Sequence, residues 1–303
     1  MGLSIKEIRD NTVRARHLMQ RSRSQGFAVG AFNIDNQETL IAVCRAAQKL
    51  QAPVLIEVSH GEVVAMGLEN IRDLVDNYRN EYGIEMYINL DHSPTVEDCK
   101  RAIDVGYEFI HIDISQANHD ATLEEITAKT KEVVEYARFT GALVEAEERY
   151  FMGSSNLHTE TIDYEEVKKY NTKPEEAVSF VANTGIDTLA VQIGNLHGLY
   201  PVPKQLDLEL LQRIRDSITC QISLHGGSGT PLHYFEEAAK IGVSKVNINS
   251  DMRYAFRKTL EKVLADHLDE YAIVKLMPEV YGAVQAVVEE KIQAFGSSQK
   301  AVM

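Results

Sequence analysis

Short apolar runs rich in β-branched residues recur along the whole chain, and longer stretches with helical spacing separate them. The runs that we expect to be strands are Ala28–Ile34, Val54–Ser59, Met86–Asp91, Phe109–Asp113, Leu143–Glu147, Thr188–Ile193, Ile222–His225 and Lys245–Asn249. Apolar residues three and four positions apart predict helices over Asn36–Leu50, Thr95–Val105, Leu123–Thr140 and Lys173–Thr184. This alternation predicts parallel strands joined by helical crossovers. Eight such units favour an α/β fold of the (β/α)8 TIM-barrel type over an open, doubly wound sheet.

The barrel pattern continues without a break from one end of the chain to the other. No Pro-, Gly- or Ser-rich linker or abrupt change of composition divides it, so we expect one domain over residues 1–303. After Asp251 the spacing predicts two extra C-terminal helices, one to about Tyr271 and one from about Val280 to Phe295. The small, polar tail Gly296–Met303 is expected to fray.

Composition narrows the possible partners and the location. A formal net charge of −14 argues against binding to nucleic acid or an anionic membrane, although backbone N–H groups can still bind a phosphorylated metabolite. The three cysteines lie far apart, which favours free thiols in a reducing compartment. The first ten residues contain no signal-peptide core, and no run of about 18 apolar residues predicts a membrane span. We therefore expect a cytoplasmic protein.

Polar residues stand at the end of every predicted strand, where barrels of this kind place their chemistry. His92, Glu147, His197 and His225 combine imidazoles with a carboxylate, and this is a plausible ligand set for catalytic Zn2+. A single histidine at a strand end is more often structural, but three at separate strand ends favour a metal. The remaining histidines are interpreted as surface or core residues.

Two loops are candidates for binding a phosphate. The glycine-rich turn Gly226–Gly229, with Gly227 in it, follows the seventh strand, and Asn249 and Ser250 follow the eighth. Phosphate sites in such barrels commonly use these two loops, and glycine lets the backbone approach an anion closely.

Together, the strand-end segments resemble the class II fructose-bisphosphate and tagatose-bisphosphate aldolases over nearly the whole chain. The matching segments are Gly30–Asn33, Leu90–His92, His111–Ser115, Val144–Glu147, Gly194–Tyr200, Leu224–Gly229 and Lys245–Asp251. The resemblance implies that His92, His197 and His225 bind Zn2+, with Glu147 a ligand in one state of the site. It also implies that Asp91 transfers the proton at the hydroxyl where the carbon–carbon bond breaks.

The resemblance further implies the residues that hold the substrate. Those near the phosphate and the sugar hydroxyls would be Asn33, Ser59, Gly198, Gly226, Ser228, Asn247, Asn249 and Ser250. Arg253 would reach the far phosphate of a bisphosphate. The resemblance also implies a monovalent cation, Na+ or K+, beside the phosphate loop, and a homodimer or homotetramer.

The residue chemistry agrees with a metal-dependent cleavage. Retro-aldol cleavage leaves an enediolate, and a Lewis acid on the ketone oxygen spreads that charge. Attraction to a dication would keep Asp91 ionised. The only lysine in these segments, Lys245, stands at a strand start, which disfavours a Schiff-base mechanism.

The chain departs from the resemblance directly after Glu147. The aldolases continue there with a flexible loop of glycines and acidic residues that carries a proton-transfer glutamate. This chain reads Glu148-Arg149-Tyr150-Phe151-Met152-Gly153 instead. Glu148 is our candidate for that role and Glu160 the second; a solvated loop charge is the other interpretation of Glu148.

These observations predict reversible retro-aldol cleavage of a ketose bisphosphate, most simply fructose 1,6-bisphosphate, to dihydroxyacetone phosphate and an aldehyde phosphate. One alternative is an aldolase for another ketose phosphate, such as a tagatose, deoxy- or sulfo-sugar derivative. A second is a zinc-binding barrel that has lost catalysis. A third is a zinc hydrolase, which would need no phosphate loops.

Overall fold

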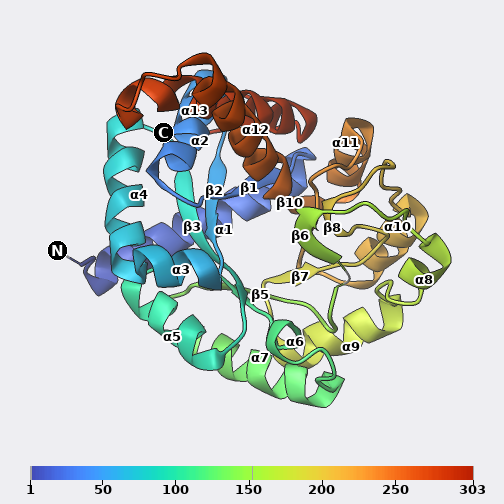
Figure 1. Cartoon of the computed structure of the whole chain (residues 1–303). Helices are drawn as coiled ribbons and strands as arrows, with labels where there is room; N and C mark the ends of the chain where they lie inside the picture. The colour runs from blue at the N-terminus through green and yellow to red at the C-terminus, as the bar shows by residue number, and fades with distance from the viewer. Residues whose placement is uncertain (1, 152, 303) are drawn as a thin grey trace.

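Eight parallel strands form a closed barrel, and helices surround it (Figure 1). The computed structural model describes residues 2–151 and 153–302. Around the barrel the strands follow the order β1, β10, β9, β7, β5, β4, β3, β2. Their bounds are β1 Val29–Asn33, β2 Val54–Val58, β3 Met86–Ser93, β4 Phe109–Ile112, β5 Leu143–Ala146, β7 Thr188–Ala190, β9 Gln221–Leu224 and β10 Val243–Ile248. Each overlaps one predicted run, which confirms the (β/α)8 barrel.

The helices lie outside the barrel, and those predicted between the strands are confirmed. Their bounds are α1 Ile5–Gln25, α2 Gln37–Leu50, α3 His60–Met66, α4 Leu68–Tyr82, α5 Val96–Val105, α6 Ile114–Ala117, α7 Leu123–Ala137, α8 Tyr164–Lys168, α9 Pro174–Thr184, α10 Leu208–Ser217, α11 Leu232–Ile241, α12 Ser250–Asp266 and α13 Ile273–Ala294. The last helix begins earlier than predicted and runs through Pro278. Leu276 and Val280 pack there against Val263 of α12, and this contact supports the added turns.

Helix α1 closes the amino-terminal end of the barrel and was not predicted. Its Leu18 and Met19 pack with Leu55 and Phe109, which point inward from β2 and β4. Because this end is filled with apolar side chains, substrate chemistry is left to the carboxyl ends of the strands.

The barrel interior carries a buried charged layer beneath those carboxyl ends. The Lys245 ammonium lies 2.9 Å from carboxylate oxygens of both Glu57 and Glu145, and all three side chains are essentially inaccessible. Asn89 donates a hydrogen bond of 2.8 Å to Glu57. Burial lowers the pKa of Lys245, but Glu145 above all outweighs this, so its pKa is raised and the ammonium stays charged.

Two further segments differ from expectation. Strands β6 (Gly153–Leu157) and β8 (His197–Leu199) form a small separate parallel sheet that the sequence did not predict. The C-terminal tail is held rather than frayed, because the N–H groups of Gln299 and Ala301 donate to carbonyls at the end of α2. Met303 lies outside the described residues.

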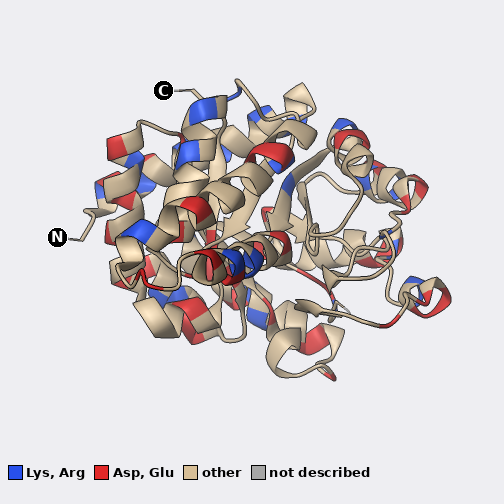
Figure 2. Cartoon of the chain, turned by 45° about the horizontal axis from the view of Figure 1, so that its top comes forward, with Lys and Arg blue, Asp and Glu red and all other residues tan. Residues whose placement is uncertain are grey.

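Acidic and basic residues alternate over the outer helices (Figure 2). Within the described part of the chain, no helix is both long enough and apolar enough to cross a membrane.

Candidate active site

The end of β3 has an irregular backbone that brings two adjacent side chains into the barrel mouth. The pairing of β3 with β4 shifts register between Leu90 and Ser93, and His92 has a φ of 44°. In a regular strand, neighbouring side chains point to opposite faces. The bulge and the left-handed residue instead let Asp91 and His92 line the same cavities. A strained backbone at a non-glycine residue often marks a functional site.

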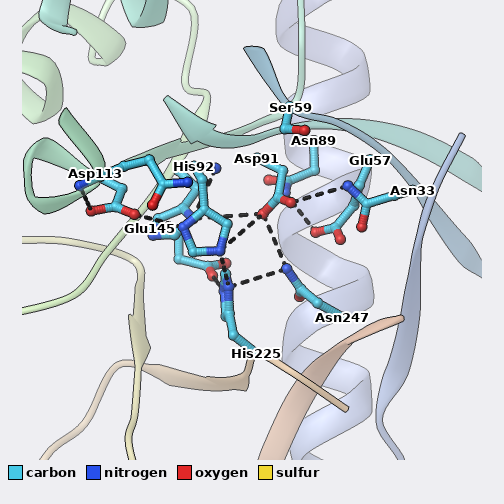
Figure 3. A network of polar contacts seen from close by, with 12 residues as sticks. Asn33, Glu57, Ser59, Asn89, Asp91, His92, Asp113, Glu145, His225 and Asn247 are labelled. Atoms are coloured by element: carbon cyan, nitrogen blue, oxygen red, sulfur yellow. Dashed lines mark hydrogen bonds and ion pairs between the residues drawn. The ribbon is translucent and has the colours of Figure 1, made fainter. Parts of the chain in front are cut away.

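Three histidines from three strand ends converge beside Asp91. The ring centroid of His92 lies 5.1 Å from that of His197 and 4.7 Å from that of His225. His92 Nε2 lies 2.9 Å from His225 Nδ1 (Figure 3). The structure therefore brings together the three imidazoles expected from the sequence.

Two buried carboxylates fix how these rings carry their protons. Asp113 Oδ2 lies 2.6 Å from His92 Nδ1, and Glu145 Oε1 lies 2.5 Å from His225 Nε2. Burial alone would raise the pKa of both carboxyls, but their charged neighbours lower it below the ordinary range, so both are ionised and accept. The lone pairs of His92 Nε2 and His225 Nδ1 therefore face each other, and a proton or a metal ion must lie between them.

Glu147 brings an oxygen within metal-ligand distance of His92 and Asp113. Its Oε2 is buried without a hydrogen-bond partner and lies 3.7 Å from His111 Nε2. Burial, followed by repulsion from Asp113, raises the pKa of Glu147 well above its ordinary range. A cation would relieve both penalties, and imidazole nitrogens with one carboxylate are the donor set of Zn2+. The residues therefore fit a zinc ion.

The charge on His92 also favours a bound cation. Burial lowers its pKa, but Asp91 and Asp113 outweigh this and raise it to about 10. In contrast, burial lowers the pKa of His225 to about 3, which keeps that ring neutral, as a metal ligand must be. The cluster thus attracts one positive charge, and a metal ion would displace the proton from His92.

His111, which we had interpreted as a surface or core residue, is fully buried but belongs to this cluster. Its ring centroid lies 4.6 Å from that of His92 and 4.7 Å from that of His225. The backbone N–H of His92 donates to His111 Nδ1 at 3.2 Å, so Nε2 carries the ring proton and faces Glu147. His111 therefore supports the strained His92 backbone.

Asp91 is oriented by two amides. Asn33 donates to its Oδ2 and Asn247 to its Oδ1, each at 3.1 Å, from the neighbouring strands β1 and β10 (Figure 3). Burial would raise the pKa of Asp91, but His92 above all lowers it well below the ordinary range. An ionised, fixed carboxylate beside the histidines suits proton transfer.

Two cavities that share lining residues open at this point. The larger, of about 340 Å³, includes Ser59, Asn249 and Arg253 among its lining residues. The smaller, of about 30 Å³, is lined by the remaining predicted substrate residues apart from Gly227, namely Asn33, Gly198, Gly226, Ser228, Asn247, Asn249 and Ser250. Gly227 instead donates its N–H to the carbonyl of Asn247, beneath the cavity.

Arg253 is held at the rim of the larger cavity by two carboxylates. It bonds to Asp35 at 2.7 Å and to Glu62 at 2.5 Å. These bonds fix the guanidinium at the mouth, on the side of Ser59.

Comparison with known proteins agrees with this geometry. The family model "Fructose-bisphosphate aldolase class-II" matches residues 13–300. A fructose-bisphosphate aldolase of Streptococcus pneumoniae is 39% identical over 95% of this chain and 99% of its own. The chain belongs to the class II fructose-bisphosphate aldolase family.

Two other relatives show the breadth of this aldolase family. A sulfofructosephosphate aldolase of Alkalicoccus urumqiensis is 29% identical over 94% of this chain and 96% of its own. The crystal structure of the YdjI aldolase from Escherichia coli K12 has a TM-score of 0.76 and 27% identity, over 95% of this chain and 98% of that one.

Within this aldolase scaffold, the structure does not bring the two candidate loop glutamates into the cavities. Glu148 lies past the end of β5, lines neither cavity and is buried 3.8 Å from Arg149. Glu160 is exposed and bonds to His158 at 2.6 Å.

Two unpredicted side chains occupy the outer wall of the larger cavity instead. His119 and Tyr150 line it, and their rings stack with centroids 3.8 Å apart. No lysine is among the described residues that line either cavity, which agrees with a metal-dependent rather than a Schiff-base aldolase.

Proposed function

We propose that this chain cleaves fructose 1,6-bisphosphate reversibly to dihydroxyacetone phosphate and an aldehyde phosphate. The observation that carries the proposal is the placement of Asp91. Its carboxylate is fixed by Asn33 and Asn247 and lines the same two cavities as His92 and His197.

Zn2+ is the metal that we propose for His92, His197 and His225, with Glu147 as a further ligand. When bound, it would supply a Lewis acid for the ketone oxygen of the substrate. Asp91 then takes the proton from the hydroxyl at the carbon–carbon bond that breaks, and returns it in the reverse direction. The neighbouring Asn33 and Asn247 amides keep Asp91 oriented through this cycle.

The smaller cavity is our proposed site for the phosphate of the dihydroxyacetone phosphate half. Ser228 Oγ accepts hydrogen bonds from the N–H groups of Asn249 and Asp251 at 3.3 and 3.1 Å. Since both acceptor positions are used, its own O–H remains free to donate to an anion. Gly198 and Gly226, at positive φ, bring the backbone close to the same space.

Arg253 is our proposed contact for the second phosphate. It lines the larger cavity and is already fixed by Asp35 and Glu62. Binding an anion there therefore costs little further side-chain entropy.

His119 is our proposed replacement for the loop glutamate of the family. It lines the larger cavity, whereas Glu148 and Glu160 do not. The stacked Tyr150 ring would orient the imidazole, which can give and take a proton at one nitrogen.

Deuterium exchange between solvent and dihydroxyacetone phosphate isolates this proton transfer from carbon–carbon cleavage. His119→Gln should slow the exchange, while the matched Glu148→Gln should leave it unchanged. The opposite pattern would return the role to Glu148.

A second substrate is supported by the altered loop and by the relative named as a sulfofructosephosphate aldolase. Turnover of a panel of tagatose, deoxy- and sulfo-sugar phosphates beside fructose 1,6-bisphosphate separates these possibilities. The highest kcat/KM identifies the preferred ketose phosphate.

We also propose that residues 1–303 form one domain and that the protein is a cytoplasmic homodimer or homotetramer. The turn between α12 and α13 exposes Leu268 and Tyr271 by 86% and 91%, and the start of α13 exposes Val274 by 81%. Such a cluster of exposed apolar residues is typical of an interface. Light scattering of the wild type and of Leu268→Glu tests this, since the variant should dissociate.

The Asp91→Asn variant tests the proposed function. It should keep its zinc content, because Asp91 is not in the proposed ligand set, and lose cleavage. Full activity in Asp91→Asn would instead overturn the assigned role, and absence of activity in the wild type would favour a non-catalytic zinc protein.

A further inference from the structure

A buried lysine lies directly behind the smaller cavity. Lys204, in the segment between β8 and α10, is 1% exposed. Its ammonium nitrogen lies 2.6 Å from the backbone carbonyl oxygen of Leu196, 2.7 Å from that of Gly198 and 2.9 Å from that of Gly226, and it also contacts that of Ser228, so its three N–H groups are shared among four acceptors.

These four carbonyls belong to two loops, which are also joined where Asn195 donates to the His225 carbonyl. Leu196 and Gly198 flank His197 after β7, whereas Gly226 and Ser228 follow β9. Three of the four residues line the smaller cavity. Lys204 therefore ties together both loops proposed to hold the phosphate.

Lys204 has no carboxylate in direct contact among the described residues; Asp251, whose charge acts on it, pairs with Lys291 instead. A buried ammonium is costly without such a partner. Burial accordingly lowers the pKa of Lys204 to about 7. An anion in the adjoining cavity would supply the missing negative charge.

The arrangement of carbonyl oxygens around Lys204 also resembles a binding site for a monovalent cation. Four backbone carbonyl oxygens around one positive charge are the kind of cage that coordinates K+ in proteins. Here the ammonium of Lys204 fills that cage, which is why we assign no separate Na+ or K+ to these carbonyls.

We propose that Lys204 is a positioning residue that acts as a built-in monovalent cation for phosphate binding. It holds the Gly198 and Gly226 loops in their binding geometry and places a positive charge behind the substrate phosphate. The proposal rests on the proposed function only in taking a phosphate as the ligand of the smaller cavity.

A purely structural role for Lys204 would predict loss of folding without any specific response to small cations. A built-in cation predicts that an external one can replace it where space is available. Lys204→Ala leaves that space between the carbonyls, whereas Lys204→Met fills it with an apolar chain of similar length. The two variants are therefore a matched pair.

The experiment uses the zinc-loaded protein and inorganic phosphate as the probe, in potassium, ammonium or tetramethylammonium chloride at equal ionic strength. Calorimetry gives the phosphate affinity, and unfolding scans give the Tm in each salt. Both readouts are independent of turnover, so they remain informative even if fructose 1,6-bisphosphate is not the substrate.

We expect wild-type phosphate affinity to be the same in all three salts. Lys204→Ala should bind phosphate about tenfold or more weakly in tetramethylammonium, as expected when a charged donor is lost, and recover in potassium or ammonium. Its Tm should rise in the same two salts, and Lys204→Met should show neither recovery. With a sugar-phosphate substrate, the Lys204→Ala defect should lie in KM more than in kcat.

Two results would overturn the proposal. One is a folded Lys204→Ala variant whose phosphate affinity equals that of the wild type or does not respond to the cation. The other needs no variant: a wild-type protein whose phosphate affinity depends on potassium or ammonium would show that Lys204 does not take the place of a cation. Failure of the variants to fold leaves this wild-type measurement decisive.

Discussion

Asp113 controls which nitrogen of His92 can bind the metal, so Asp113→Asn is a sharp test of the site. In the wild type, Asp113 Oδ2 accepts the proton of His92 Nδ1 at 2.6 Å. Its other oxygen, Oδ1, accepts from Ser115 Oγ at 2.5 Å and from the Gln116 N–H at 3.0 Å. These two donors will retain the carbonyl oxygen of an asparagine at the Oδ1 position.

The NH2 group of the introduced asparagine must then face His92. It donates to Nδ1, and the ring proton moves to Nε2, which removes the lone pair that faces His225. Partners that orient metal-bound histidines are typically worth roughly 10- to 100-fold in metal affinity. Because this substitution reverses the tautomer, we expect the upper end, about 2.8 kcal/mol at about 1.4 kcal/mol per factor of ten.

The assay is a zinc competition titration against a chromophoric chelator at neutral pH. Asp120→Asn is the matched control, because Asp120 is an exposed aspartate outside the proposed zinc ligand set. We expect weaker zinc binding in Asp113→Asn alone and partial recovery of cleavage at high zinc. An Asp113→Asn variant that binds zinc as tightly as the wild type would refute the reasoning on tautomers.

Three other substitutions test separate parts of the structure. Gly226→Ala should abolish phosphate binding, measured by calorimetry, because its Cβ would collide with the Leu196 carbonyl at a position with φ of 62°; unchanged affinity would contradict this. Arg253→Met should raise KM for fructose 1,6-bisphosphate by about tenfold and leave that for fructose 1-phosphate nearly unchanged, since one charged contact is lost; equal effects on both substrates would exclude a role at the second phosphate. Burial raises the pKa of Glu57 to about 8, so the folded state binds a proton at Glu57 more tightly than the unfolded state does. The stability that this proton contributes is fully present below the unfolded pKa and is lost as pH rises through about 8. In urea unfolding, Glu57→Gln should therefore reduce the fall of stability between about pH 5 and 8, and an unchanged slope would show that Glu57 is ionised throughout.

The barrel could be predicted from the sequence because its strands are buried on both faces and read as continuous apolar runs. The small β6–β8 sheet could not, because Gly153–Leu157 and His197–Leu199 are short and polar. Helix α1 was missed because its charged outer face obscured the apolar stripe of Leu18 and Met19 that closes the barrel.

Within the site, the residues at strand ends were predictable because the fold itself requires chemistry there. His111 was not, since it lies inside β4 and its role depends on a bond to the displaced backbone of His92. The role of Lys204 could not be predicted either, because four carbonyls from two loops surround it only after folding. The Glu148 candidate rested on proximity in sequence, whereas in the structure that side chain is buried beside Arg149 and lines neither cavity.

The most direct test of the central claim is coupled-enzyme release of dihydroxyacetone phosphate from fructose 1,6-bisphosphate, with a chelator and after addition of Zn2+. We predict cleavage that the chelator abolishes and Zn2+ restores. Cleavage that survives complete removal of the metal, or no cleavage of any ketose phosphate by folded, zinc-loaded protein, would contradict the assignment of a zinc-dependent aldolase.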